Sequence, residues 1–226
     1  MCELTNSFGI LYNNFYNNLI SYPFNHSTYK FFSDDICDNL IDNINQIIDL
    51  LNTDKNLSDY RYKINLNGNT KDGFDNIEFI EKIKNIEPLN TVLKAYQKEI
   101  PINLYKKYNN DEPDIVKYCL MIVCDKENYE IGPHTDSYVR NATMVTYLGP
   151  INNNENLGLF IYKDLINRHK NEWKKIHYSF DNFEPIKQIE YYKGSTIDFK
   201  VSKNSFHGVP KIKSTNDRYR LQFFIF

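Results

Sequence analysis

The chain has 226 residues, which is enough for one domain with a sizeable core. Its formal net charge of -2 gives no electrostatic reason to expect nucleic acid or an anionic membrane as a partner. No apolar run approaches the roughly 18 residues of a transmembrane helix, and the N-terminal residues lack the pattern of a secretion signal. The four cysteines are sparse and irregularly spaced, which favours reduced thiols in the cytoplasm.

The first half of the chain predicts helices. Ser33 is suited to cap a helix over about 34–51, because two acidic residues follow it and apolar residues recur at helical spacing. The stretch 52–73 is polar and rich in turn-forming residues. A second helix is expected from about Asp75, and a third over about 88–101. The apolar stripes of these helices are expected to pack in a core.

After about residue 115, short apolar runs separated by glycines predict strands. The expected strands are 118–123, 142–148, 157–162, 186–192, 196–199 and 218–226. Helices followed by strands predict an α+β, mainly β, fold within a single domain, 1–226. Its N-terminal region, about 1–115, is expected to cover one sheet of a two-sheet roll formed by about 116–226, and closing the roll protects the strand edges.

The segment 151–193 is long for a connection between two strands of a roll. A solvated surface excursion and a rim that touches substrate both fit this segment, which holds Trp173. His26, His169 and His177 lack a carboxylate at ligand spacing in a strand context, so they are not expected to be metal ligands.

The last strand has two different faces. Alternation along a strand places Tyr219, Leu221 and Phe223 on an apolar face that is suited to packing beneath helices. The opposite face is charged and polar, which is costly in a core unless that face lines a cavity with polar partners. The residues expected to face the interior of the roll are Arg218, Arg220, Gln222 and Phe224, with Thr143, Val145 and Tyr147 from the strand 142–148.

A candidate metal site begins at His134-Thr135-Asp136. Two histidines and one carboxylate hold non-haem Fe(II) on one face and leave its other positions open. The side chains of His134 and Asp136 can point the same way from the end of an extended strand, and His207 follows 71 residues after Asp136. Arg218, eleven residues further on, offers a planar fork for a carboxylate. This set predicts 2-oxoglutarate as a cosubstrate; ordinary surface histidines and a strand-end arginine are the alternative.

These residues resemble the Fe(II)- and 2-oxoglutarate-dependent oxygenases, and among them the prolyl-hydroxylase-like group, over about 118–226. The similar segments are Pro133–Asp136, Arg140 with Thr143 and Thr146–Leu148, Gly194–Phe199, Phe206–Val209 and Arg218-Tyr219. The resemblance implies a double-stranded β-helix, or jelly roll, in which the two histidines and Asp136 bind Fe(II). It also implies that Arg218 and Tyr147 hold 2-oxoglutarate, that O2 is consumed, and that ascorbate serves as a reductant. Asp136 argues against the halogenating variant of the family, which lacks that carboxylate.

The chain departs from the family's pattern at two positions. Cys124 stands where the family often has a tyrosine, and Arg220 stands where it tends to have a small residue. Arg220 is expected to pair with an internal acid, for which Asp198 is a candidate, or with a carboxylate of the primary substrate; alternatively, a bulge turns it toward the rim. The cosubstrate pocket is expected to include Thr143 and Val145. The residues expected near the substrate or behind the metal ligands are Arg220, Arg140, Cys124, Gln222 and Phe224.

The sequence does not specify the primary substrate, since a fold does not fix a substrate. A peptidyl proline follows from the resemblance, and a free amino acid or a small metabolite is an alternative. A non-catalytic, cupin-like module that binds a metal or ligand is an alternative of a different class. Small-molecule or peptide partners are expected, with neither nucleic acid nor membrane among them.

Overall fold

The structure is a computed structural model that describes residues 10–11, 14–15, 19–51, 61–66, 86–109, 111–113, 116–149, 157–168, 173, 176–214 and 217–226. At 46–51, 62 and 65 it describes the backbone alone. The helix expected from Asp75 falls almost entirely outside these residues. Among the described helices, none is long and apolar enough to cross a membrane.

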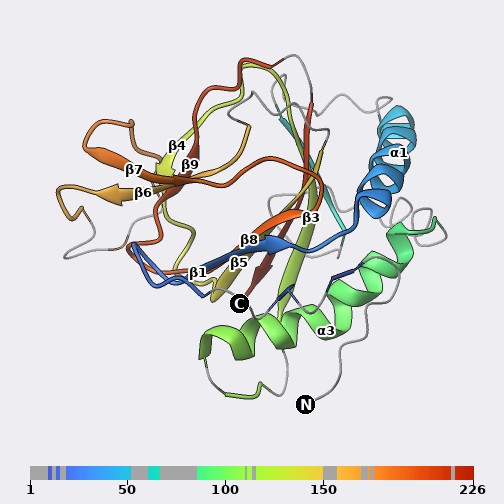
Figure 1. Ribbon diagram of the computed structural model, residues 1–226, viewed down its shortest axis with the longest axis horizontal. Helices are drawn as coiled ribbons and strands as arrows, with labels where there is room; N and C mark the ends of the chain where they lie inside the picture. Colours follow the sequence, from blue (N-terminus) through green and yellow to red (C-terminus); the bar gives the residue numbers. More distant parts are fainter. Residues whose placement is uncertain are drawn as a thin grey trace.

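A six-stranded antiparallel sheet forms one wall of the molecule (Figure 1). In spatial order its strands are β1 (His26–Lys30), β8 (Ser195–Lys200), β5 (Ala142–Gly149), β10 (Arg218–Ile225), β3 (Tyr118–Asp125) and β2 (Arg61–Asn65). β10 lies between β5 and β3, and its side chains project alternately from the two faces of the sheet.

A four-stranded antiparallel sheet forms the opposite wall (Figure 1). Its order is β4 (Ile131–His134), β9 (His207–Val209), β6 (Phe160–Asp164) and β7 (Phe183–Gln188). A buried apolar core joins the two sheets, with Val145 and Ile197 from the large sheet and Ile161 and Val209 from the small one. This arrangement confirms the expected jelly roll.

Two helices cover the outer face of the large sheet, on the side away from β6 and β7 (Figure 1). α1 (Asp34–Leu51) begins after Ser33, whose hydroxyl accepts a hydrogen bond from the backbone N–H of Ile36 at 3.5 Å. α3 (Leu89–Asn109) packs across the same face. Their apolar stripes meet the outward residues of β10, which confirms both the two-sided last strand and the buttressing helices.

The N-terminal region differs from its prediction in two respects. It contributes β1 and β2 to the edges of the large sheet, although the stretch 52–73 shows only turn-forming signals. α3 continues through Pro101, because Ile100 and Leu104 are buried and this packing outweighs the backbone hydrogen bond that proline cannot make.

A buried polar cluster ties α3 and β1 to β8 on the helix-covered side of the large sheet. The Asp198 carboxylate is fully buried and accepts hydrogen bonds from Lys107 at 2.8 Å, from Tyr29 at 2.6 Å and from Tyr108. Lys107 also donates to the carbonyl of Phe15 at 2.7 Å. A buried carboxylate is stable only with such partners, so this cluster fixes the helix layer on the sheet.

Candidate metal and cosubstrate site

The two histidines of the candidate metal site face each other across neighbouring strands. β4 pairs with β9 so that His134 lies opposite His207, and their ring centroids are 4.4 Å apart. The Nδ1 atom of His134 lies 3.0 Å from the carbonyl of Gly132, and that of His207 lies 2.9 Å from the carbonyl of Ser205. Because a carbonyl can only accept, each Nδ1 carries the proton. The lone pair of each Nε2 is therefore available to a metal.

Asp136 completes this group just beyond the end of β4. One ligand atom from each of His134, Asp136 and His207 lies within 4.8 Å of the others. Arg140 donates to one oxygen of the Asp136 carboxylate at 2.7 Å, and Thr143 donates to the other at 2.6 Å. These two bonds fix the orientation of the carboxylate before a metal binds.

The buried environment keeps His134 and Asp136 in the protonation states that a metal requires. Burial lowers the pKa of His134 well below its usual value, and the neighbouring His207 lowers it further, so the ring is neutral at pH 7. Burial alone would raise the pKa of Asp136, but the Arg140 guanidinium, helped by the hydrogen bond from Thr143, lowers it to about 2. The donor set of two imidazoles and one carboxylate fits Fe(II) and also suits other divalent transition metals.

Part of the long segment 151–193 lies directly beside these ligands. The indole N–H of Trp173 donates to the Thr135 hydroxyl at 2.9 Å, and the His177 ring centroid lies 4.5 Å from that of His134. A Cβ added at Gly132 would stand 1.9 Å from the carbonyl oxygen of Tyr178, so the two backbones are in close contact. Part of the segment therefore lies against the metal site, and contact with a substrate stays a prediction.

Three arginines converge on one buried carboxylate. Asp125, the last residue of β3, is fully buried and forms ion pairs with Arg61, Arg218 and Arg220. Arg61 contacts one carboxylate oxygen, whereas Arg218 and Arg220 both contact the other. Burial alone would raise the pKa of Asp125, but Arg220, Arg61 and Arg218 hold it well below its usual range.

Tyr147 and Arg218 have hydrogen-bonding capacity that Asp125 does not use. The Tyr147 hydroxyl oxygen accepts from Arg218 at 3.2 Å and from the backbone N–H of Leu159 at 2.8 Å, which leaves its own proton for another acceptor. The Nε atom of Arg218 is buried and has no hydrogen-bond partner. Buried donors are rarely left unpaired, so this corner fits an additional carboxylate, such as the far end of 2-oxoglutarate.

One cavity connects the metal ligands with the arginines. It is lined by His134, His207, Val145, Leu159, Gln222 and the three arginines that contact Asp125, among other residues. Its walls come from both sheets, as expected for the interior of a jelly roll. The predicted inward positions of Arg218, Arg220, Gln222 and Val145 are therefore confirmed.

Other predicted site residues occupy different places. Thr143 bonds to Asp136 and is not among the residues that line this cavity. The guanidinium of Arg140 lies 3.5 Å from the Phe224 ring centroid, so both support the Asp136 side of the site. Cys124 was expected near the substrate or behind the metal ligands, but this prediction is wrong. Its side chain lies in the core beneath the helices, because alternation turns Asp125 inward instead.

Arg220 has an internal acid as its partner, as predicted, but the acid is Asp125. Asp198 is the wrong candidate because its side chain faces the helix layer, where Lys107 and two tyrosines surround it. The strand pairing of β10 with β5 shifts between Tyr219 and Arg220, yet Arg220 remains buried and points inward. The bulge therefore does not turn Arg220 to the rim.

Sequence reasoning missed Asp125, Arg61 and the contact of Trp173. Asp125 comes two residues after the end of the expected strand 118–123, and an acid at the end of a fully apolar run was the available signal. Arg61 lies in β2, within a stretch whose composition predicts turns. No spacing rule connects Trp173 with Thr135, 38 residues earlier.

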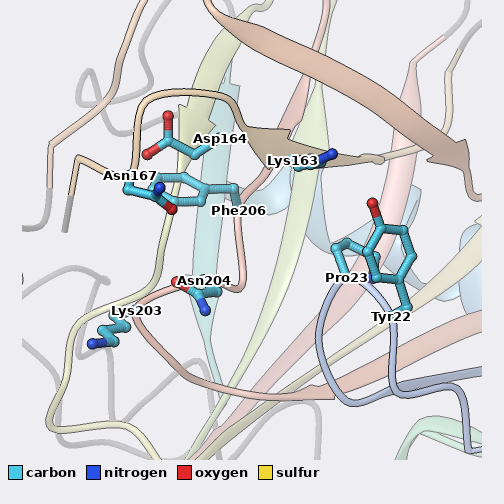
Figure 2. Close-up of a pocket in the computed structure, with 8 residues that line it drawn as sticks. All are labelled: Tyr22, Pro23, Lys163, Asp164, Asn167, Lys203, Asn204 and Phe206. Atoms are coloured by element: carbon cyan, nitrogen blue, oxygen red, sulfur yellow. The ribbon is translucent and has the colours of Figure 1, made fainter. Parts of the chain in front are cut away.

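A second hollow is lined by none of the three metal-ligand candidates, although Phe206 in its wall precedes His207 in the chain (Figure 2). Its volume is about 400 Å³, and its walls include Tyr22, Lys163, Asp164 and Phe206. Figure 2 shows Tyr22 and Pro23 across the hollow from Asp164 and Asn167. None of the residues predicted from the sequence to form a site lines this hollow.

Comparisons with known proteins place this chain by its fold. No protein-family model matches the sequence, and no curated protein matches it. Among solved structures, HygX from Streptomyces hygroscopicus with nickel and 2-oxoglutarate bound is similar, with a TM-score of 0.55, 9% identity, and coverage of 88% of this chain and 81% of that one.

Two prolyl hydroxylases have a similar fold as well. The Pseudomonas putida prolyl-4-hydroxylase has a TM-score of 0.52 and 12% identity, and the match covers 88% of this chain and 91% of that one. The Trichoplax adhaerens prolyl hydroxylase, in complex with a peptide fragment of the hypoxia inducible factor oxygen degradation domain, has a TM-score of 0.51, 14% identity and coverage of 89% and 83%. The resemblance to the prolyl-hydroxylase-like group is thus confirmed at the level of the fold.

Proposed function

We propose that this protein is an Fe(II)- and 2-oxoglutarate-dependent dioxygenase that hydroxylates a C–H bond of an organic substrate. One observation carries the proposal: His134, Asp136 and His207 gather as a ligand group, and the two histidines line a cavity that Arg218 also lines. A metal needs the first three residues, and a carboxylate cosubstrate needs the fourth. A structural metal site alone would not require the arginine.

Each residue has a defined part in this proposal. His134, Asp136 and His207 would hold Fe(II), while Arg140 and Thr143 keep the Asp136 carboxylate in position. Iron, 2-oxoglutarate and O2 supply the oxidative chemistry, and ascorbate would keep the metal reduced. The far carboxylate of 2-oxoglutarate would take the unpaired Nε of Arg218 and the proton of Tyr147, with Val145 packing beside it. The protein orients these groups and excludes water.

The substrate is proposed to be a peptidyl prolyl residue or a small metabolite. The structural neighbours support both options, since the Trichoplax enzyme was solved with a peptide and HygX with hygromycin B. We further propose a single oxygenase domain over 1–226 in the cytoplasm, with neither nucleic acid nor membrane as a partner. The low net charge and the sparse cysteines support this.

Anaerobic purification, reconstitution with Fe(II) and addition of 2-oxoglutarate and O2 test the reaction. Succinate should form in step with O2 uptake, even slowly without a primary substrate, and Asp136→Ala should abolish it. Lys106→Ala, on the exposed face of α3, is the control that should retain the activity. Tight metal binding without any succinate would instead support a non-catalytic metal-binding module.

A further inference from the structure

Arg218 and Arg220 contact the same oxygen atom. Both guanidinium groups donate through Nη1 to one oxygen of the Asp125 carboxylate, and all three side chains are buried. Arg61 binds the other oxygen of Asp125, so Asp125 already has a cationic partner on each oxygen. Two donors on one shared oxygen must lie close to each other, and they line one cavity.

Charge within this pair is unbalanced. Two guanidinium groups with a single carboxylate between them leave one positive charge, even if Arg61 is left out of the count. Like charges that share a buried site repel unless an anion separates them. Burial, together with Arg218 and Arg61, lowers the pKa of Arg220 to about 10 despite the attraction of Asp125. Arg218, Arg220 and Asp125 together carry one net positive charge, and Arg61 adds another, so the cluster has the charge to accept a further anionic group.

Arg220 is placed to share that anion with Arg218. Alternation puts both side chains on the inner face of β10, and Arg220 lies two residues further along the strand. The Nη2 atom of Arg220 donates a long hydrogen bond of 3.3 Å to the side-chain oxygen of Gln222. Gln222 also lines the cavity. The Nε of Arg218 has no partner. An anion that binds Arg218 in this cavity therefore also approaches Arg220.

We propose that Arg218 and Arg220 together form a two-arginine anchor for the distal carboxylate of the 2-oxo acid, with Asp125 as the residue that positions both. This inference rests on the proposed function and assigns a second cosubstrate-binding residue to the same site. A planar fork from each arginine gives more directional contact than a single guanidinium. Arg220 then determines selectivity for 2-oxo acids with a negative charge at the far end.

Binding measurements with two matched probes test this. 2-Oxopentanoate has the same five-carbon chain as 2-oxoglutarate, but a methyl group replaces the distal carboxylate. Each is titrated into protein loaded with Mn(II), which supports no turnover, by calorimetry or by the fluorescence of Trp173, the single tryptophan of the chain. Arg220→Gln should weaken 2-oxoglutarate binding at least tenfold and reduce its preference over 2-oxopentanoate by a similar factor.

Further variants distinguish an anchor from a structural role. Arg220→Lys keeps the charge and should restore part of the affinity, while Arg168→Gln, which removes an arginine paired with Asp164, should change binding less than twofold. In the double variant Arg218→Gln/Arg220→Gln the two losses should not add, because both arginines serve one carboxylate.

The possible failures are distinguishable. If Arg220→Gln binds 2-oxoglutarate as tightly as the native protein, the two-arginine anchor is wrong while the proposed function stands. Equal weakening of both probes would also contradict it, since the loss would then not involve the distal carboxylate. If the native protein with Mn(II) binds neither 2-oxo acid, the proposed function itself fails.

Discussion

At the scale of single residues, the most informative contacts lie behind the metal ligands. Thr143 donates to the Asp136 carboxylate from the inner face of β5, whereas Thr146 of the same strand bonds to Thr196. Thr143→Val should therefore weaken metal affinity roughly 10–100-fold, the usual cost of losing a residue that orients a metal ligand. Thr146→Val makes the same chemical change away from the site and should leave metal affinity within about twofold. Titration with Co(II) compares the two.

Asp125 is the residue whose loss should most affect this site. Asp125→Asn leaves three arginines facing an uncharged amide, and breaking a buried charge pair costs about 3–5 kcal/mol of unfolding free energy. Urea denaturation measures this loss, and Asp34→Asn at an exposed ion pair is the control. Added 2-oxoglutarate should recover part of the stability in Asp125→Asn, because the ligand supplies the missing negative charge. An unchanged denaturation midpoint would show that Asp125 does not hold the arginines together.

The same carboxylate gives a pH dependence with a defined sign. The folded-state pKa of Asp125 lies below its ordinary value of 3.8, so the unfolded chain binds its proton more readily than the folded one. Its stabilising contribution is therefore complete above about pH 5 and declines as the pH falls through 3.8 and below. Native protein should lose stability over this acidic range, and Asp125→Asn should show a shallower decline in the same urea titrations.

At the scale of elements, periodicity and spacing predicted which residues form the site better than they predicted where each strand begins and ends. The apolar runs that became β3, β5, β8 and β10 were recognisable, since these strands are buried on both faces or alternate clearly. β4 and β9 have only four and three residues, too few for a periodic signal, yet they hold the two histidines. The histidines were found by residue type and spacing, which a short strand does not obscure.

Long-range pairing explains what the sequence could not show. Arg61 reaches Asp125 because β2 pairs with β3, and Arg220 reaches it because β10 pairs with β3 on the other side. Neither pairing leaves a pattern in the local sequence. Asp198 and Asp125 are equally plausible acids by composition, and only the side of the sheet that each faces distinguishes them.

The docking of the long segment on β4 is testable through one glycine. A methyl group at position 132 would overlap the Tyr178 carbonyl, a backbone group that cannot rotate aside as a side chain can. Gly132→Ala should push residues 176–180 away from β4 and increase amide hydrogen exchange there, while Glu130→Ala, at an exposed position beside the strand, should not. Metal affinity should fall as well, because His134 bonds to the Gly132 carbonyl. Unchanged exchange at 176–180 in Gly132→Ala would contradict this close packing.

At the scale of the whole molecule, the cavity depends on a sheet held in place by the helix layer. The buried Asp198 cluster is a polar connection between that layer and the sheet, and its cation is Lys107, whose side chain is 4% exposed. The adjacent Lys106 pairs with Glu112 at the surface, with 37% of its side chain exposed. Neighbouring lysines of one helix therefore provide a matched comparison between a buried and an exposed ion pair.

Lys107→Met should cost about 3–5 kcal/mol of unfolding free energy, because it removes one partner of a buried pair and leaves Asp198 with its tyrosines alone. Lys106→Met should cost no more than about 1 kcal/mol, as is usual for exposed pairs. Urea denaturation is monitored by two signals. The fluorescence of Trp173 reports unfolding near the metal site, and circular dichroism reports the loss of helix. If the helix layer and the roll form one cooperative unit, both signals should shift together in Lys107→Met. A shift in the helical signal alone would show that the roll keeps its site without the helices. Equal losses of unfolding free energy in Lys107→Met and Lys106→Met would contradict a structural role for the cluster.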